Sequence, residues 1–166
     1  MLVLGIDPGM ATTGYGLLRV TGHAYKVLDF GCIKTAPQMG VPQRLVELYQ
    51  GLEDLLNTHR PAAVAVEELF FNKNVKTAMA VGQARGVILV AAALKEIDVV
   101  EYTPLQVKQG VVGYGRASKK QVQEMVKTLL KLEEIPKPDD AADALAVAIC
   151  HAHALPLMAH LQRMGR

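Results

Sequence analysis

The sequence predicts a single three-layer α/β domain with a mixed β-sheet. Two β-rich stretches follow the first strand closely, which is typical of an antiparallel meander, and helical and strand patterns alternate after them. Short apolar runs recur along the chain, as expected of strands that are covered on both faces. A length of 166 residues, 51% of them hydrophobic, suits one domain with a core of its own.

The first half of the chain predicts a strand, a hairpin and a helix. Residues 2–6 form the first apolar run, and Gly9, Gly14 and Gly16 surround the turn that follows. The meander comprises residues 16–20 and 25–35. Pro42 stands in the first turn of an amphipathic helix that ends near residue 57, because apolar residues recur at steps of four and three: Val41, Leu45, Leu48, Leu52 and Leu55.

The second half predicts two more strands and four helices. Residues 62–66 form a buried strand that ends in Glu67 and Glu68, and residues 99–102 form another. Between them lies the longest helix, from about residue 75 to 96, which is apolar nearly all round and is therefore expected to be buried on more than one side. Ser118 is expected to cap a helix, with Gln121 at the capping-box position. The other helices are expected at residues 104–112 and 138–153, and residues 155–166 are expected to form a frayed tail after a domain of residues 1–154.

Basic residues are concentrated in one segment, although the net charge of +2 indicates no particular partner. Residues 104–132 contain the single acid Glu124 and six basic residues: Lys108, Arg116, Lys119, Lys120, Lys127 and Lys131. Such a segment is either a solvated helix face or a surface that binds phosphate groups.

The sequence indicates a cytoplasmic protein. Cys32 and Cys150 have neither metal-ligand spacing nor a disulfide framework, so we expect buried free thiols in a reducing compartment. The amino terminus enters a strand without a basic leader, and no uninterrupted apolar run reaches the ~18 residues of a membrane span.

Acidic residues fall at the ends of predicted elements. Asp7 follows the first strand, where ligands of α/β sheets bind, and the Gly9 backbone would let a phosphate come close. Only one of Glu67 and Glu68 can share a site with Asp7, because successive strand residues point to opposite faces, and alternation does not say which. Asp140 and Asp143 share one face of the last helix, while Asp139 is left to cap it. Each acid taken alone also fits an ordinary role, in a turn, at a strand exit or near a helix dipole.

Taken together, these acids predict a metal site. Carboxylates that are packed closely repel one another unless a cation joins them. Magnesium is the natural cation, since it prefers carboxylate oxygen and retains water molecules. A pair of ions roughly 4 Å apart would serve phosphodiester hydrolysis.

Five blocks of the sequence resemble the RuvC family of Holliday-junction resolvases. They are Gly5-Ile6-Asp7-Pro8-Gly9, Ala65-Val66-Glu67-Glu68-Leu69-Phe70, Gly82-Gln83-Ala84-Arg85-Gly86, Gln106-Val107-Lys108-Gln109 and Asp140-Ala141-Ala142-Asp143-Ala144-Leu145. The resemblance implies a ribonuclease H-like domain with a mixed five-stranded sheet flanked by helices. It also implies four catalytic, metal-binding acids, Asp7, Glu67, Asp140 and Asp143, which leaves Glu68 outside the site.

The resemblance further implies contacts to DNA and a defined reaction. Lys108 and Lys119 match basic positions of the family, with Lys120 as an alternative to Lys119. Phe70 matches an aromatic residue that stacks on bases, although Phe71 could exchange roles with it and a hydrophobic plug under the loop is the alternative role.

The implied reaction is magnesium-dependent cleavage of two opposed strands of a four-way DNA junction, with Mn²⁺ as a possible substitute. This cleavage gives 5′-phosphate and 3′-hydroxyl ends. Two symmetric cuts imply a homodimer, which we assign to the apolar helix with its small residues Ala80, Gly82, Ala84 and Gly86. RuvA and RuvB are the implied partner proteins.

Two other functions fit parts of the pattern. A ribonuclease H-like nuclease acting on RNA would share the Asp7 region but not the Gln-Ala-Arg-Gly and Val-Lys-Gln blocks. An actin-like phosphate-binding protein would use Asp7, Gly9 and Gly14, but that fold needs two lobes and this chain has residues for one.

Overall fold

The computed structural model describes residues 1–22, 24–68 and 75–164. Its centre is a five-stranded sheet with the order β3-β2-β1-β4-β5. The strands are β1 (Leu2–Asp7), β2 (Thr12–Thr21), β3 (Ala24–Lys34), β4 (Ala63–Glu67) and β5 (Asp98–Tyr102). β2 pairs antiparallel with both β1 and β3, whereas β4 pairs parallel with both β1 and β5. The predicted mixed five-stranded sheet is therefore confirmed.

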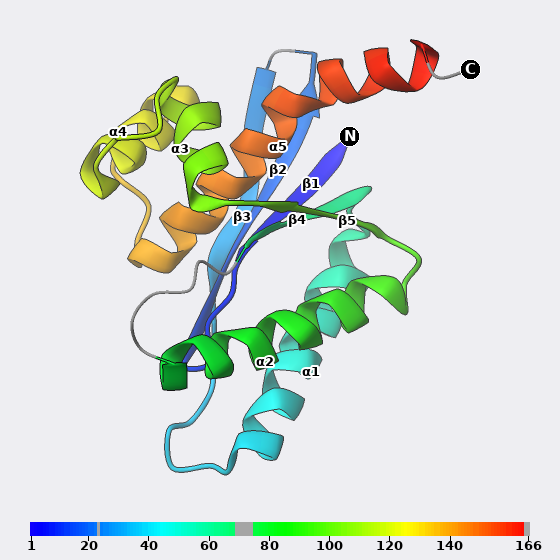
Figure 1. Cartoon of the computed structure of the whole chain (residues 1–166), viewed down its shortest axis with the longest axis vertical. Coiled ribbons are helices and arrows are strands. Elements are labelled where there is room, and N and C mark those ends of the chain that lie inside the picture. Colours follow the sequence, from blue (N-terminus) through cyan, green and yellow to red (C-terminus); the bar gives the residue numbers. More distant parts are fainter. Residues whose placement is uncertain (23, 69–74, 165–166) are drawn as a thin grey trace.

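Helices cover both faces of this sheet, which confirms the three-layer arrangement (Figure 1). One face carries α1 (Val41–His59) and α2 (Val75–Ala93), and the other carries α3 (Pro104–Val112), α4 (Lys119–Leu129) and α5 (Asp139–Met164). Alternation along the strands supplies a core to each layer. Leu4 and Val64 belong to the core with α1 and α2, whereas Val3 and Ala65 belong to the core with α5.

The helix starts follow the sequence signals closely. Pro42 lies in the first turn of α1, and α4 begins with the expected capping box between Ser118 and Gln121. A second capping box joins Thr103 and Gln106 at the start of α3. The starts of these two short helices, which both lie in the basic segment, are thus fixed by local hydrogen bonds.

Helix α2 packs on the sheet and on α1, and part of its surface is left open by the described residues. Ala84 and Ile88 are fully buried on the side that packs on the sheet. By contrast, 63% of Met79 and 54% of Val90 are exposed. The apolar residues on this open part are therefore not buried by the described part of the chain. The helix ends at Ala93, three residues before the expected end.

Helix α5 is longer than expected, since it continues to Met164 and does not end near His153. The expected end was wrong because Ala154 and Leu155 still pack against the core that α5 shares with the sheet. Favourable apolar contacts therefore continue beyond the residues assigned to the helix.

Two smaller expectations concern the cysteines and the membrane. Both cysteines are free, and Cys150 is buried as expected, but Cys32 is only half-buried. In the described part of the chain, no helix combines the length and the hydrophobicity that crossing a membrane requires.

Candidate active site

Asp7 and Glu67 end two neighbouring parallel strands. Ile6 lies opposite Val66, so the acids that follow them lie side by side at the carboxyl edge of the sheet. Both continue the row of side chains that faces α5, because residues two apart on a strand share a face. Glu68 is exposed beyond the strand end, and its backbone N–H donates to the carbonyl of Tyr102 at 2.8 Å. The register of β1 with β4 thus places Glu67 beside Asp7 and leaves Glu68 outside the candidate site.

Glycines in β1 and β2 bring α5 down onto these acids. Gly14 pairs with Asp7 in the sheet, and a Cβ atom on Gly14 would lie 2.0 Å from the backbone carbonyl oxygen of Asp140. A Cβ atom on Gly5 would lie 2.1 Å from the carbonyl oxygen of Ala144. Such distances are impossible for real side chains, so the first turn of α5 can lie directly over the sheet only where glycine stands.

The second strand begins earlier than the expected residue 16. β2 begins at Thr12, so Gly14 and Gly16 lie within the strand. A Cβ atom on Gly9, which does lie in the turn, would be 2.2 Å from the carbonyl oxygen of Thr12, so glycine there serves the turn's own packing. The signal that sequence reasoning missed is the recurrence of glycine on one face of two paired strands, which marks a close helix approach.

Asp140 and Asp143 lie in the first turns of α5, three residues apart, and their charges raise the pKa of Asp7. Burial is the largest cause of that rise, followed by the charges of Glu67, Asp143 and Asp140, and together they bring the pKa of Asp7 to about 8. The pKa of Glu67 is raised by burial and by Asp143, against the opposing effect of a hydrogen bond with Asp7. This hydrogen bond raises the pKa of Asp7 and lowers that of Glu67, so Asp7 is its donor. The acids form one interacting cluster.

Two lysines neighbour the acidic cluster. The Lys119 Nζ atom lies 2.8 Å from an Asp143 carboxylate oxygen and 3.6 Å from an Asp139 carboxylate oxygen. Lys108 and Lys119 line one cavity together with Glu67 and Asp143. The pKa of Asp143 is raised by burial, while the hydrogen bond and charge of Lys119 oppose the rise. The basic segment therefore reaches the acids through α3 and the start of α4.

The predicted DNA contact Lys120 is separate from this cavity. Lys120 lines a different groove, with Tyr114, Glu124 and Thr128. Phe70 and Phe71 lie outside the described residues.

The donor set fits a hard divalent cation. All four candidate ligands are carboxylates, the groups that Mg²⁺ and Mn²⁺ prefer. The pKa values of Asp7, Glu67 and Asp143 are raised first by burial and then by neighbouring carboxylates, and a bound cation opposes both effects. Within the described ranges, no group of three Asp, Glu, His or Cys side chains forms a ready-made metal-binding set. Because Asp143 is paired with Lys119, coordination by this carboxylate requires that the ion pair open or be shared.

Solved structures with the same architecture identify the class of protein. The structure of RuvC from Thermus thermophilus matches with a TM-score of 0.88 and 40% sequence identity, over 95% of this chain and 96% of that one. A structure of T. thermophilus RuvC in complex with Holliday junction substrate matches with a TM-score of 0.90, again at 40% identity. The chain is thus a metal-dependent nuclease with a ribonuclease H-like fold.

Sequence relatives identify the family. The family model described as crossover junction endodeoxyribonuclease RuvC matches residues 3–151. The crossover junction endodeoxyribonuclease RuvC of Alkaliphilus metalliredigens is 61% identical over 153 residues, which cover 92% of this chain and 93% of the relative. The chain belongs to the RuvC family, whose members act in DNA recombination and repair. Neither the RNA nuclease nor the actin-like alternative is supported by these matches.

Proposed function

We propose that the chain cuts four-way DNA junctions in two opposed strands, leaving 5′-phosphate and 3′-hydroxyl ends. The observation that carries this proposal is the convergence of Asp7, Glu67 and Asp143 at one sheet edge, beside Lys108 and Lys119. Acids alone would repel a phosphodiester, whereas acids that hold cations beside lysines attract it. The substrate is supported by the 40% identical T. thermophilus RuvC, solved with a Holliday junction.

Asp7, Glu67, Asp140 and Asp143 would together hold two Mg²⁺ ions, with Mn²⁺ as a substitute. When bound, such ions activate water for attack on phosphorus and stabilise the leaving oxygen. In the metal-free protein Glu67 accepts a hydrogen bond from Asp7, so the two carboxylates are adjacent before an ion binds. Lys119 holds Asp143 beside them and can neutralise charge when phosphate approaches.

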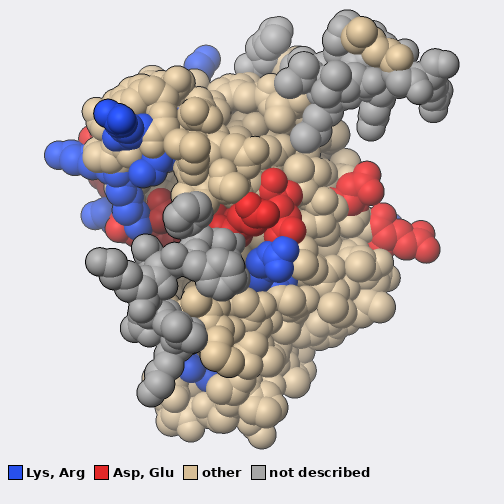
Figure 2. Space-filling view, in the orientation of Figure 1, with Lys and Arg blue, Asp and Glu red and all other residues tan. Residues whose placement is uncertain are grey.

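DNA contacts are assigned to the side of the molecule formed by α3 and α4, where Lys and Arg side chains gather (Figure 2). Lys108 and Lys119 would contact phosphates next to the cut, because they share a cavity with the acids. Lys120 would contact a phosphate farther along, since its groove is separate. Phe70 would stack on a base where the junction opens.

A homodimer is proposed through the outer face of α2. Apolar side chains of α1 and α2 line one shared groove, namely Leu45, Val46, Tyr49, Val87 and Val90. Two opposed cuts need two sites related by a two-fold axis, and an exposed apolar helix face is a suitable interface.

RuvA and RuvB are the proposed partner proteins in the cytoplasm. Residues 1–154 are proposed to be the nuclease domain, and residues 155–166 a tail.

The test compares a synthetic four-way junction with a linear duplex of the same sequence, each incubated with Mg²⁺. Mapped cuts should be paired, symmetric and confined to the junction. Asp7→Asn, Glu67→Gln, Asp140→Asn and Asp143→Asn should each abolish most cleavage while leaving junction binding without metal similar or stronger, because a charge that faces phosphate is removed.

Glu68→Gln is the matched control, because Glu68 is exposed beyond the strand end, and it should cut nearly normally. Equal cutting of junction and duplex by the unmodified protein would overturn the proposed substrate. An inactive Glu68→Gln beside an active Glu67→Gln would overturn the ligand assignment.

A further inference from the structure

A second groove reaches the acidic cluster at Asp140 and has no described lining residue in common with the cavity of Lys108 and Lys119. Its described lining comes from the β1–β2 turn and the starts of α1, α2 and α5, and includes Gly9, Thr12, Arg44, Thr77, Val81 and Asp140. The first cavity shares Glu67 and Asp143 with the cluster, and this groove shares Asp140. The acids therefore lie between two hollows.

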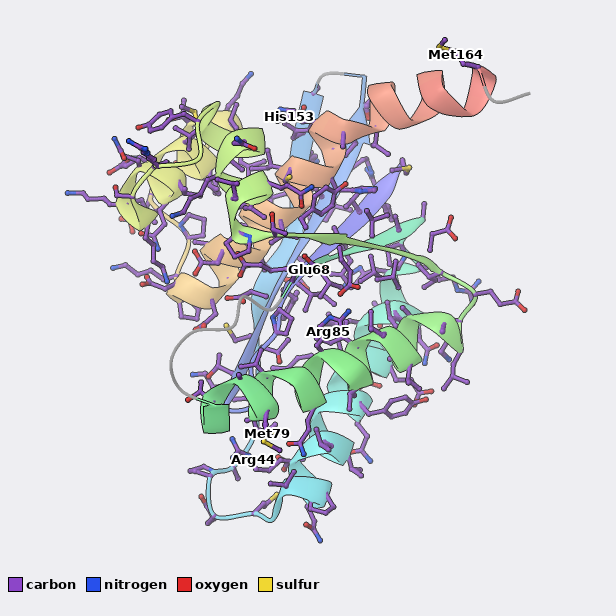
Figure 3. The ribbon with its side chains drawn as sticks, in the orientation of Figure 1. Arg44, Glu68, Met79, Arg85, His153 and Met164 are labelled. Atoms are coloured by element: carbon purple, nitrogen blue, oxygen red, sulfur yellow. The ribbon has the colours of Figure 1, made fainter. Side chains whose placement is uncertain are left out.

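Arg44 is held in a fixed direction in this second groove. Its Nε–H donates to the Thr35 hydroxyl at 2.8 Å, and that hydroxyl donates to the backbone carbonyl of Met10 at 2.6 Å. Thr35 is only 7% exposed, so it is a rigid anchor. Figure 3 shows Arg44 near the start of α1, beneath the first turns of α2.

Within the described part of the chain, the Thr35 hydroxyl is the one acceptor found for the Arg44 side chain. A guanidinium carries five N–H donors in one plane, and Thr35 engages only the Nε donor. Among the described residues, Arg44 forms no ion pair with any acid. An anchored guanidinium without a described ion pair, in a groove that also reaches the acidic cluster at Asp140, is suited to bind an anion.

We propose that this groove binds a backbone phosphate of the cleaved DNA strand adjacent to the scissile phosphate, with Arg44 as its ligand. The inference rests on the proposed function and adds a second strand contact to it. A guanidinium matches a phosphate in shape and charge, and Thr35 has already restricted its motion. Phosphates follow one another every 3.4 Å along the axis of each duplex strand. Lys108 and Lys119 would hold the strand on one side of the cut, and Arg44 on the other.

The first experiment measures junction binding without divalent metal at several salt concentrations, for the unmodified protein, Arg44→Ala, Arg44→Lys and Arg19→Ala. Arg19 is the matched control because it is exposed and lies opposite Leu2, at the end of β1 far from Asp7. Arg44→Ala should bind roughly ten- to a hundredfold more weakly, with a salt slope lower by about one. Arg44→Lys should recover part of the affinity, and Arg19→Ala should match the unmodified protein.

The second experiment separates a phosphate contact from support of the Thr35 loop. Single phosphates beside the cut are replaced in turn by uncharged methylphosphonates. One replacement should weaken the unmodified protein as much as Arg44→Ala does, and should not weaken Arg44→Ala further. If every replacement weakens both proteins by the same factor, Arg44 acts through packing and the inference is overturned.

The two proposals fail in different ways. An unmodified protein that does not cut the junction contradicts the proposed function. Normal cutting and binding by Arg44→Ala, in a protein whose unmodified form does cut the junction, overturns the Arg44 inference alone.

Discussion

Burial and three neighbouring carboxylates raise the pKa of Asp7 to about 8 from its ordinary value of 3.8. In the unfolded chain these causes vanish, so Asp7 loses its proton near its ordinary pKa. Folded Asp7 therefore retains a proton over a pH range in which unfolded Asp7 does not. Its contribution to stability is complete below about pH 4 and is lost as the pH rises through 8.

Asp7→Asn should consequently stabilise the metal-free protein, and more at high pH. We expect no gain in the free energy of unfolding near pH 4 and a gain of roughly 2–4 kcal/mol near pH 8, since one pKa unit corresponds to about 1.4 kcal/mol. Urea denaturation in chelator at both pH values measures the difference. Asp54→Asn, on the exposed side of α1, should show no such trend. A gain that does not change with pH would contradict this account of the cluster.

The effect of replacing a lysine by alanine should depend on the distance of that lysine from the acids. Lys119 contacts Asp143, so Lys119→Ala should slow single-turnover cleavage by roughly ten- to a hundredfold even at saturating protein. Lys120 lines a separate groove, so Lys120→Ala should weaken binding and lower the salt slope by about one, without slowing the saturated rate. Lys127→Ala, farther along α4, is the control. Equal effects of all three on the saturated rate would point to a diffuse basic face.

At the scale of elements, the contact between α5 and the sheet positions half of the acids. Gly14 lies directly beneath Asp140, and Gly5 lies beneath Ala144. The two strands thus lack side chains where the helix backbone descends, and the first turn of α5 reaches the edge where β1 and β4 end. Helix placement, and not loop geometry, sets the distance between the two pairs of acids.

Gly14→Ala should therefore damage the site through the backbone. Its Cβ atom would lie 2.0 Å from the Asp140 carbonyl oxygen, so α5 must move. We expect a stability loss of roughly 1–3 kcal/mol and strongly reduced cutting at temperatures where the variant remains folded. Gly22→Ala is the comparison. Its φ of +58° is strained for alanine, but an added Cβ atom would meet no atom beyond its chain neighbours within 4 Å. This variant should therefore lose some stability and retain activity. Full activity in folded Gly14→Ala would refute this role of the glycine.

Local patterns were sufficient to predict most elements but not their close contacts. Apolar periodicity and Pro42 predicted α1, and Ser118 with Gln121 predicted the start of α4. Alternation could not choose between Glu67 and Glu68, because the choice depends on which strand face α5 covers. That face is a tertiary property, decided by the register of Ile6 with Val66. The length of α5 was missed for the same reason, since contacts of Leu155 with the core are non-local.

At the scale of the whole molecule, the sheet separates two surfaces of different character. The α3–α5 side carries the basic segment, and the α1–α2 side carries an apolar groove with exposed residues such as Val46 and Val90. The bidentate ion pair between Arg85 on α2 and Glu101 on β5 ties the second layer to the sheet. Both Arg85 and Glu68 are labelled in Figure 3, near the sheet edge that carries the acids. Assembly is thus assigned to the α1–α2 layer and the lysine contacts to DNA to the α3–α5 layer, while Arg44 at the start of α1 adds a DNA contact from the first of these layers.

Val90→Glu should break the proposed homodimer while the chain stays folded, because 54% of Val90 is exposed in the single chain. The monomer should lose paired cutting. Ala84, which sequence reasoning placed among the interface residues, is fully buried against the sheet, so Ala84→Glu should unfold the protein instead. Sedimentation with circular dichroism distinguishes these outcomes, and Met39→Glu in the loop before α1 is the control. A folded Val90→Glu dimer that still makes paired cuts would exclude this face.

The position of α5 in the chain has a consequence for biosynthesis. β1 and β4, which carry Asp7 and Glu67, leave the ribosome long before α5, which carries Asp140 and Asp143. Until α5 emerges, half of the acids are missing and the glycines of β1 and β2 have no helix over them. A nascent chain, or one cut short by a premature stop codon before residue 139, therefore cannot assemble the cluster. Translation itself thus delays nuclease activity until the chain can fold completely.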